Sequence, residues 1–455
     1  FARVCGPGCR SGSRCPQPPK LSSSCGRLRT RVRMALSLLP ALTPVEDDSS
    51  YAAGGSHQFA DSGASLRQSC SFAMHRTQQD PVIDGRTPPD WENNEFSTEL
   101  WLARRWATYP QALSARSSDF AFVAFNQSLL CDMRKFVTIQ REWTQQVVPF
   151  AESLGKSTPV VIANLLEHCP PPRQRPSNVL LLREVTRDSL SVPFVVSSPA
   201  WLVRWPSLGG DPYAVPWAER KLLFFGGRAP KPRISAVRYR VWQQLRAEPR
   251  ATSHVHSLWC VHAMGCVATQ ELEARSCNRR VVEQAGRATC QQDNATLQEM
   301  LRTNEMLPRD TYLRNTFSHR FCLVVRGDAN GTPKLTEVLA AGGAGGCVPV
   351  FVFDQGSRFP YDTVLDYCQL GVFVTPRRAE TRLSEVLDAL ERLTPAQVEA
   401  KRVALRRARH RFVFRNDSSF AHPSAAEHTY EQVCAALRGP ASTLTRAWRM
   451  DQCEL

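Results

Sequence analysis

The residues best suited to chemistry stand in one short stretch that follows a buried-strand pattern. Residues 321–325 are an apolar run of strand length, and a polar loop follows from Arg326 to Gly331. Thr332 predicts a helix N-cap, and Pro333 suits the first helical position. A helix start carries free backbone N–H groups and the positive end of the helix dipole, which together bind anions. The stretch therefore predicts a phosphate-binding helix start.

Two charged residues lie one turn apart on this expected helix. Lys334 sits in the first turn, where a cation is unfavourable for the helix itself, and a bound diphosphate would explain it. Glu337 lies on the same face and could accept hydrogen bonds from a ribose, as acidic residues do in dinucleotide sites. An ordinary surface salt bridge between the two is the alternative.

A second candidate loop, Gly226-Gly227-Arg228, follows an expected strand at 221–225. Open α/β sheets bind ligands at the carboxyl ends of their strands, and a guanidinium suits bidentate contact with phosphate. Arg228 is therefore expected near the same phosphates, together with Arg326. A simple turn is the alternative.

Short apolar runs alternate with helical patterns, which predicts the α/β class with parallel sheets. Two such blocks predict two facing Rossmann-like domains, residues 91–220 and 221–395, the second with a Cys-rich insertion at 251–295. C-terminal helices are expected over 396–455. Residues 1–90 are basic and rich in Ser, Gly and Pro, so we expect them to be disordered, with order beginning near Trp91.

The chain has 455 residues and a net charge of +15, with 42% hydrophobic residues. These values exclude a wholly disordered chain, a polytopic membrane protein and a fibrous repeat. The charge leaves open a nucleic acid, an anionic membrane surface or an anionic small substrate as partner. Residues 401–411 are the best evidence for a polymer partner. However, an apolar face made of Val403, Ala404, Ala408 and Phe412 favours a packed helix with a solvated basic side.

The cysteines bear on compartment rather than on catalysis. No Cys/His set has zinc spacing, which makes a structural zinc site improbable. Four cysteines cluster in one polar segment, and four N-glycosylation sequons occur along the chain (Cys260, Cys266, Cys277, Cys290; Asn126, Asn294, Asn330, Asn416). Disulfides in that cluster and a secretory compartment are expected, with free thiols as the alternative.

The N-terminal stretch up to Glu46 is Arg-rich and free of acidic residues, a composition typical of targeting segments. A disordered basic tail, a secretory signal and an organelle transit peptide all remain open. A membrane anchor upstream of the given residues is also left open, because the chain begins with Phe.

Several of these segments together resemble the exostosin-family glycosyltransferases. Residues 318–327, then Lys334 to Glu337, then 346–350 and Asp354 are similar to the donor-binding signature of the family. Residues 358–367, 221–228 and 118–125 are similar to further family segments, so the matches span about residues 100 to 400. The resemblance implies a GT-B fold and a nucleotide-sugar donor, expected to be a UDP-sugar. It also implies inverting transfer to a glycan or polysaccharide acceptor in the Golgi or secretory lumen, without a cofactor or an obligatory metal.

The resemblance also assigns expected roles. Glu337 should contact the donor ribose, and Lys334, where the family usually has Arg, should contact the diphosphate. Arg228 should lie close to the diphosphate. The loops and helix start described above add Gly226, Gly227, Arg326 and Thr332 to the expected donor site. The base for the acceptor hydroxyl is not identified by the pattern; Asp119, Asp328 and Asp354 are candidates, each of which could instead be structural. The segment 340–347, rich in Gly, is about four residues longer than the family pattern.

Two other classes of protein remain as alternatives. One is a catalytically weak exostosin-like protein that binds a polysaccharide. The other is a basic protein that binds nucleic acid or an anionic surface, for which the chain offers no RNA-binding motif or zinc finger. A dinucleotide oxidoreductase is disfavoured, because the glycines at 343–346 stand at the end of a helix pattern rather than at a strand-to-helix turn. The oligomeric state is left open.

Overall fold

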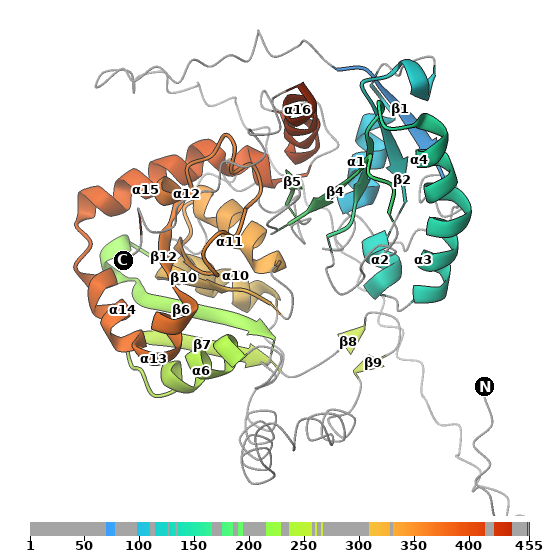
Figure 1. Cartoon of the computed structure of the whole chain (residues 1–455). Helices are drawn as coiled ribbons and strands as arrows, with labels where there is room; N and C mark the ends of the chain where they lie inside the picture. Colours follow the sequence, from blue (N-terminus) through green and yellow to red (C-terminus); the bar gives the residue numbers. More distant parts are fainter. Residues whose placement is uncertain are drawn as a thin grey trace, which may run out of the picture. The chain divides into compact units, whose positions relative to one another are not determined.

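The first of two parallel sheets lies in the N-terminal half of the computed structural model (Figure 1). Its five strands follow one another in order, β1-β2-β3-β4-β5, and every neighbouring pair is parallel. The strands are β1 (Phe72–Arg76), β2 (Phe120–Ala124), β3 (Val160–Ala163), β4 (Val179–Arg183) and β5 (Leu190–Ser191). All residues of β2 and β3 are buried, as continuous apolar runs in parallel sheets usually are.

The structure describes only part of the chain. The described residues are 70–77, 98–109, 114–125, 127–132, 135–165, 175–184, 190–193, 215–228, 236–256, 260–261, 265–266, 309–327, 331–414, 423–438, 453 and 455. They belong to one compact unit, Ser62–Leu455. The asparagines of the four sequons, Cys277 and Cys290 lie outside these residues, as do residues 194–196, whose apolar run predicts a further strand.

Strand β1 lies inside the segment for which the sequence predicts disorder, so that prediction is wrong for residues 72–76. Phe72 pairs with Phe120 of β2, and the two rings stack with centroids 5.5 Å apart. A five-residue edge strand has little apolar pattern of its own, because its conformation is set by the strand beside it.

Helices connect these strands and cover the sheet. They are α1 (Thr98–Trp106), η2 (Ala115–Ser117), α2 (Gln127–Asp132), α3 (Phe136–Glu142), η3 (Trp143–Val147) and α4 (Val148–Leu154). The last three form one continuous helical segment, with a wider turn at η3. Trp106 and Trp143 are fully buried in this first core.

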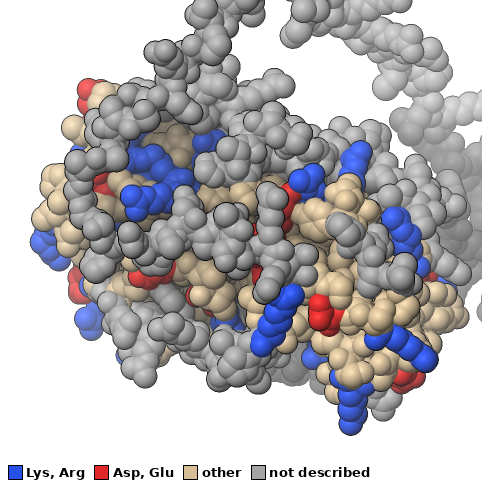
Figure 2. All heavy atoms as spheres, turned by 90° about the horizontal axis from the view of Figure 1, so that it is seen from above, with Lys and Arg blue, Asp and Glu red and all other residues tan. Residues whose placement is uncertain are grey.

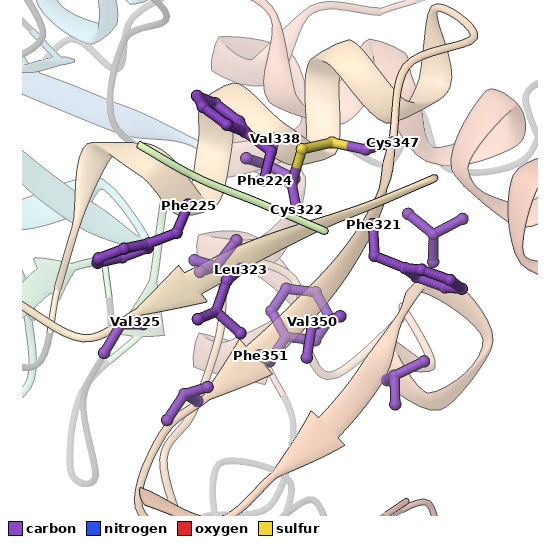
Figure 3. Close-up of a cluster of buried hydrophobic side chains, with 14 of the residues drawn as sticks. Phe224, Phe225, Phe321, Cys322, Leu323, Val325, Val338, Cys347, Val350 and Phe351 are labelled. Carbon is purple, nitrogen blue, oxygen red and sulfur yellow. A yellow bond between two sulfur atoms is a disulfide. The ribbon is translucent and has the colours of Figure 1, made fainter. Parts of the chain in front are cut away.

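The second sheet has the order β12-β11-β10-β6-β7 and is also entirely parallel. Its strands are β6 (Lys221–Arg228), β7 (Ala251–His256), β10 (His319–Val325), β11 (Val348–Val352) and β12 (Val372–Val374). The predicted α/β class with two parallel sheets is therefore confirmed. Figure 3 draws part of the second core, with a disulfide from Cys322 of β10 to Cys347 before β11.

The helical segments of this half are η5 (Trp217–Glu219), α6 (Ala236–Leu245), α10 (Arg309–Ser318), α11 (Pro333–Gly343), α12 (Tyr367–Leu370), α13 (Pro376–Thr381), α14 (Leu383–Glu391), α15 (Pro395–Ala408), η6 (Arg409–Phe412) and α16 (Ala425–Arg438). Among the described residues, no helix is long and apolar enough to cross a membrane.

Two expectations in this half are wrong. Gly226, Gly227 and Arg228 do not form a loop, because β6 continues through them and pairs with residues 254–256 of β7. Consequently the expected Cys-rich insertion cannot begin at residue 251. Cys260 and Cys266 face each other in a short antiparallel ribbon of β8 (Cys260–Val261) and β9 (Gly265–Cys266). Whether these cysteines form disulfides stays a prediction.

The C-terminal helices do not form a segment of their own. Helix α15 buries Val398, Leu405 and Ala408 in the second core, whereas α16 packs into the first core through residues that include Val433. A disulfide between Cys434 of α16 and Cys70, ahead of β1, joins positions 364 residues apart. A third disulfide joins Cys368 to Cys453.

Candidate active site

The order of the second sheet marks where a ligand should bind. The chain enters at β6, adds β7 on one side and then β10 on the other, so the order reverses between β6 and β10. Ligands of open α/β sheets bind outside the carboxyl ends of the strands at such a reversal. Arg228 ends β6 and Arg326 follows β10, so the backbone brings these two predicted residues to the same edge. The side chain of Arg228 lies outside what the structure describes.

Helix α11 begins where the sequence predicts. Thr332 is its N-cap in extended conformation, and Pro333 occupies the first position. The Thr332 hydroxyl, however, makes no cap bond. It accepts a hydrogen bond of 3.1 Å from Nη2 of Arg238, which also donates to the Val325 carbonyl at 2.9 Å. Arg238 of α6 is thus a guanidinium at the site that the sequence did not single out.

Lys334 and Glu337 form a tight, sheltered pair. The Lys334 Nζ lies 2.6 Å from Oε2 of Glu337, whose side chain is only 4% exposed. The same ammonium lies 3.9 Å from the ring centroid of Tyr312, within the range of a cation–π contact. The pair is therefore not an ordinary surface salt bridge, because its carboxylate is buried and its ammonium lies against an aromatic ring.

Gly226 allows this arrangement. A Cβ atom at Gly226 would lie 2.8 Å from Cε2 of Tyr312 and 2.6 Å from Cζ of Phe224. A side chain at this position would therefore displace the ring of Phe224, of Tyr312 or of both. A Cβ atom at Gly227 would meet no atom within 4 Å, so Gly227 faces open space.

The start of α11 holds an anion that belongs to the protein itself. The carboxylate of Glu184, at the end of β4, accepts a hydrogen bond from the Thr332 backbone N–H and one of 3.3 Å from the Thr336 hydroxyl. Glu184 is fully buried. The expectation of free N–H groups is therefore wrong for Thr332, and the N–H of Leu335 donates to the Thr332 carbonyl at 2.9 Å.

The three aspartates proposed as bases have different surroundings. Asp354 follows β11 and accepts a 2.5 Å hydrogen bond from Arg326, with both side chains 34% exposed, at the ligand-binding edge. Asp119 precedes β2, at the opposite edge of the first sheet, and accepts hydrogen bonds from the Ser71 N–H at 2.6 Å and the Ser71 hydroxyl at 3.1 Å. The structure does not bring Asp119 to the site. Asp328 lies outside the described residues.

A buried carboxyl group that the sequence did not single out lies at the ligand-binding edge of the first sheet. Glu99 in the first turn of α1 is 1% exposed, and its Oε1 accepts a 2.8 Å hydrogen bond from the Ser128 N–H. Burial raises the pKa of Glu99 to about 7, against the opposing effect of hydrogen bonds from Ser128 and from its own backbone. The sequence around Glu99 gave no signal that this carboxyl group would be buried.

Among the described residues, no group of three or more His, Cys, Asp or Glu side chains could hold a metal ion. The described site brings together a cation, buried carboxyl groups and a helix start at one strand edge.

The second parallel sheet carries this charged cluster at its reversal of strand order, where open α/β sheets bind their ligands. A family model, the Exostosin GT47 domain, matches residues 211–390. The matched region contains Lys334, Glu337, Arg326 and Asp354. Residues 211–390 are therefore similar to the family that the resemblance names.

Two solved structures are also similar to the chain. HepE from Anabaena, crystallised in complex with UDP and glucose, shares 10% identity at a TM-score of 0.32, over 74% of this chain and 81% of its own. MurG from Acinetobacter baumannii shares 11% identity at a TM-score of 0.28, over 80% of this chain and 99% of its own. No curated protein matches the chain significantly.

Proposed function

We propose that this protein transfers a sugar from a nucleoside-diphosphate sugar, specifically a UDP-sugar, to a hydroxyl of a glycan or polysaccharide, with inversion at the anomeric carbon. The observation that carries the proposal is the Lys334–Glu337–Tyr312 cluster at the strand-order reversal, inside the region that matches the Exostosin GT47 domain. In that cluster a cation suited to a diphosphate lies next to a carboxylate suited to a ribose.

The proposed chemistry needs positive charge on the leaving group. The acceptor oxygen attacks the anomeric carbon while the bond from that carbon to the diphosphate breaks, so negative charge develops on the phosphates. In the donor complex the Lys334 ammonium turns from Glu337 to these phosphates, which it stabilises most strongly in the transition state. Glu337 then accepts the ribose hydroxyls in place of the ammonium.

Glu184 gives the first turn of α11 a fixed position in this proposal. Its carboxylate uses the N–H of Thr332 and the hydroxyl of Thr336, and it leaves the ammonium of Lys334 available to the donor. No resident cofactor and no obligatory divalent metal form part of the proposal, so activity is expected to persist in excess EDTA.

We further propose that the protein works in the Golgi or secretory lumen. The disulfides Cys70–Cys434, Cys322–Cys347 and Cys368–Cys453 support this location, because disulfides persist in oxidising compartments.

The test is a panel of UDP-sugars, with release of UDP measured in the presence and absence of glycan acceptors. One sugar is expected to give UDP release that Glu337→Gln reduces at least tenfold. The matched control Glu152→Gln, an exposed residue of α4, should leave the rate unchanged. Absence of any UDP binding by the purified chain at millimolar nucleotide would refute the proposal.

A protein that binds a polysaccharide without catalysis is the second candidate. It is favoured by one observation: in this structure the charges of the site already satisfy one another, Lys334 with Glu337 and the helix start with Glu184. Binding of an acceptor glycan without any UDP binding would select this candidate.

A further inference from the structure

Glu99 stands at the carboxyl edge of the first sheet, where ligands of parallel sheets bind. It accepts the Ser128 N–H in the first turn of α2, directly after β2. The Ser128 hydroxyl in turn accepts a 3.1 Å hydrogen bond from the N–H of Leu165, which follows β3. The carboxyl group is therefore held over the ends of two neighbouring central strands.

Hydrogen bonds lead from this turn towards the donor-binding helix. The Thr98 hydroxyl donates to the Pro193 carbonyl at 3.2 Å. Two residues earlier, the Ser191 hydroxyl lies 2.8 Å from the Glu184 carbonyl and 3.1 Å from the Arg358 carbonyl. Glu184 contacts the first turn of α11. A short series of hydrogen bonds therefore connects the helix turn of Glu99 with the helix that carries Lys334.

The fold provides a hydrogen-bond partner for only one of the two carboxyl oxygens of Glu99. Its Oε2 is buried and has no hydrogen-bond partner among the described residues. A buried, unpaired carboxyl oxygen costs free energy, so its persistence calls for an explanation other than stability. The groups that act on this carboxyl are the Ser128 hydroxyl and the backbone N–H groups of Ser128 and Glu99, whereas burial dominates the shift of its pKa.

We propose that Glu99 is the catalytic base that accepts the proton of the acceptor hydroxyl through Oε2. This inference rests on the proposed glycosyl transfer. The O–H bond of the acceptor breaks, a bond forms between its oxygen and the anomeric carbon, and the bond from that carbon to the diphosphate breaks. The proton goes to Oε2, the electron pair goes with the leaving diphosphate, and Glu99 returns the proton to solvent before the next turnover.

The first test is Glu99→Gln, which keeps the size of the side chain and an oxygen that can accept the Ser128 N–H. With a saturating donor, kcat is expected to fall by about 10²–10⁴-fold, the usual range for a general base, while the Kd for UDP stays unchanged. Glu142→Gln, another buried glutamate of the same half, is the control and should retain kcat. Glu99→Ala should regain part of the lost rate when formate is added.

The second test is the dependence of kcat on pH. In the wild-type protein, kcat should rise to a plateau as one group with a pKa near neutrality loses its proton, and this step should vanish in Glu99→Gln. A Glu99→Gln variant with wild-type kcat would overturn the inference. If the variant does not fold, a wild-type profile that is flat between pH 5.5 and 8 would overturn it instead. If the wild-type protein neither binds UDP nor transfers sugar, both proposals fail; normal donor turnover with an unaffected variant removes only the role of Glu99.

Discussion

The ammonium of Lys334 meets groups from two helices. Glu337 comes from its own helix and the Tyr312 ring from α10, while Gly226 of β6 leaves room for that ring. Lysine lacks the planar fork of arginine, but an ammonium packs against an aromatic face as a compact charge. The departure from the family pattern at this position thus has a local physical basis.

Lys334→Met is expected to weaken UDP binding at least tenfold and to destabilise the fold. The loss of stability should reach roughly 3 kcal/mol, because the buried Glu337 carboxylate is left without its partner. Isothermal titration with UDP and urea unfolding give the two quantities. The double variant Lys334→Met/Glu337→Gln should recover most of the stability but none of the UDP affinity. Recovery of affinity would contradict the assigned roles.

At this scale the sequence predicted the local part of the site and missed the distant part. Thr332, Lys334 and Glu337 could be predicted because one helix start places them together. Glu184 and Arg238 contact the same turn from 148 and 94 residues away along the chain. No periodicity or spacing reports such contacts, because they depend on how whole elements pack.

The Gly-rich segment 340–347, at the end of helix α11, has a structural explanation. A Cβ atom at Gly343 would lie 2.5 Å from Cβ of Arg409 and 2.7 Å from the Leu405 carbonyl oxygen. Gly345 has a φ of +96°, which few other residues adopt, and ends the helix. The segment 340–347 therefore first packs closely against α15 and η6 and then forms a turn.

Gly343→Ala is expected to destabilise the protein by about 1–3 kcal/mol, although alanine favours helices by up to about 1 kcal/mol. The reason is that backbone and Cβ atoms, rather than a flexible side-chain end, occupy the space. Urea unfolding measures the change. Gly227→Ala, in open space, is the control and should cost far less; equal effects would show that the contact with α15 is unimportant.

Element prediction succeeded for the central strands and failed for the edges. Strands β2, β3, β10 and β11 are buried apolar runs, which the sequence alone is enough to predict. The missed strands β1, β5, β7 and β12 are the edge strands of the two parallel sheets, and β7 contains polar residues. Their conformation depends on hydrogen bonds to a neighbour, which the local sequence does not encode.

For the whole molecule, the net charge of +15 comes from basic residues in separate places rather than from one surface. On the face drawn in Figure 2, basic side chains form one compact group and otherwise lie among acidic and uncharged residues. In α15, Arg402 and Arg406 pair with Glu399, and Lys401 donates to two backbone carbonyls. These engaged cations favour a packed helix over a polymer-binding surface; absence of nucleic-acid binding stays a prediction.

The Cys70–Cys434 disulfide is expected to contribute about 2–5 kcal/mol, because it closes a very long loop. Replacing both cysteines by Ala should lower the unfolding midpoint and expose β1 and α16 first to hydrogen exchange. The variant Cys368→Ala/Cys453→Ala, whose bond closes a span of 85 residues outside the first core, is the comparison. Equal protection of β1 in both variants would count against a role of the first bond in that core.

Helix α16 has a consequence for synthesis. It supplies Tyr430 and Val433, among others, to a core whose remaining members, apart from Phe414, lie in the first half of the chain. At about 5–20 residues per second, the ribosome needs roughly 20–70 s to make the 364 residues between Cys70 and Cys434. During that time the first sheet has emerged but lacks its last covering helix. The nascent chain should therefore depend on chaperones to shield the uncovered face, and a stop codon before residue 425 should damage the half that is translated first.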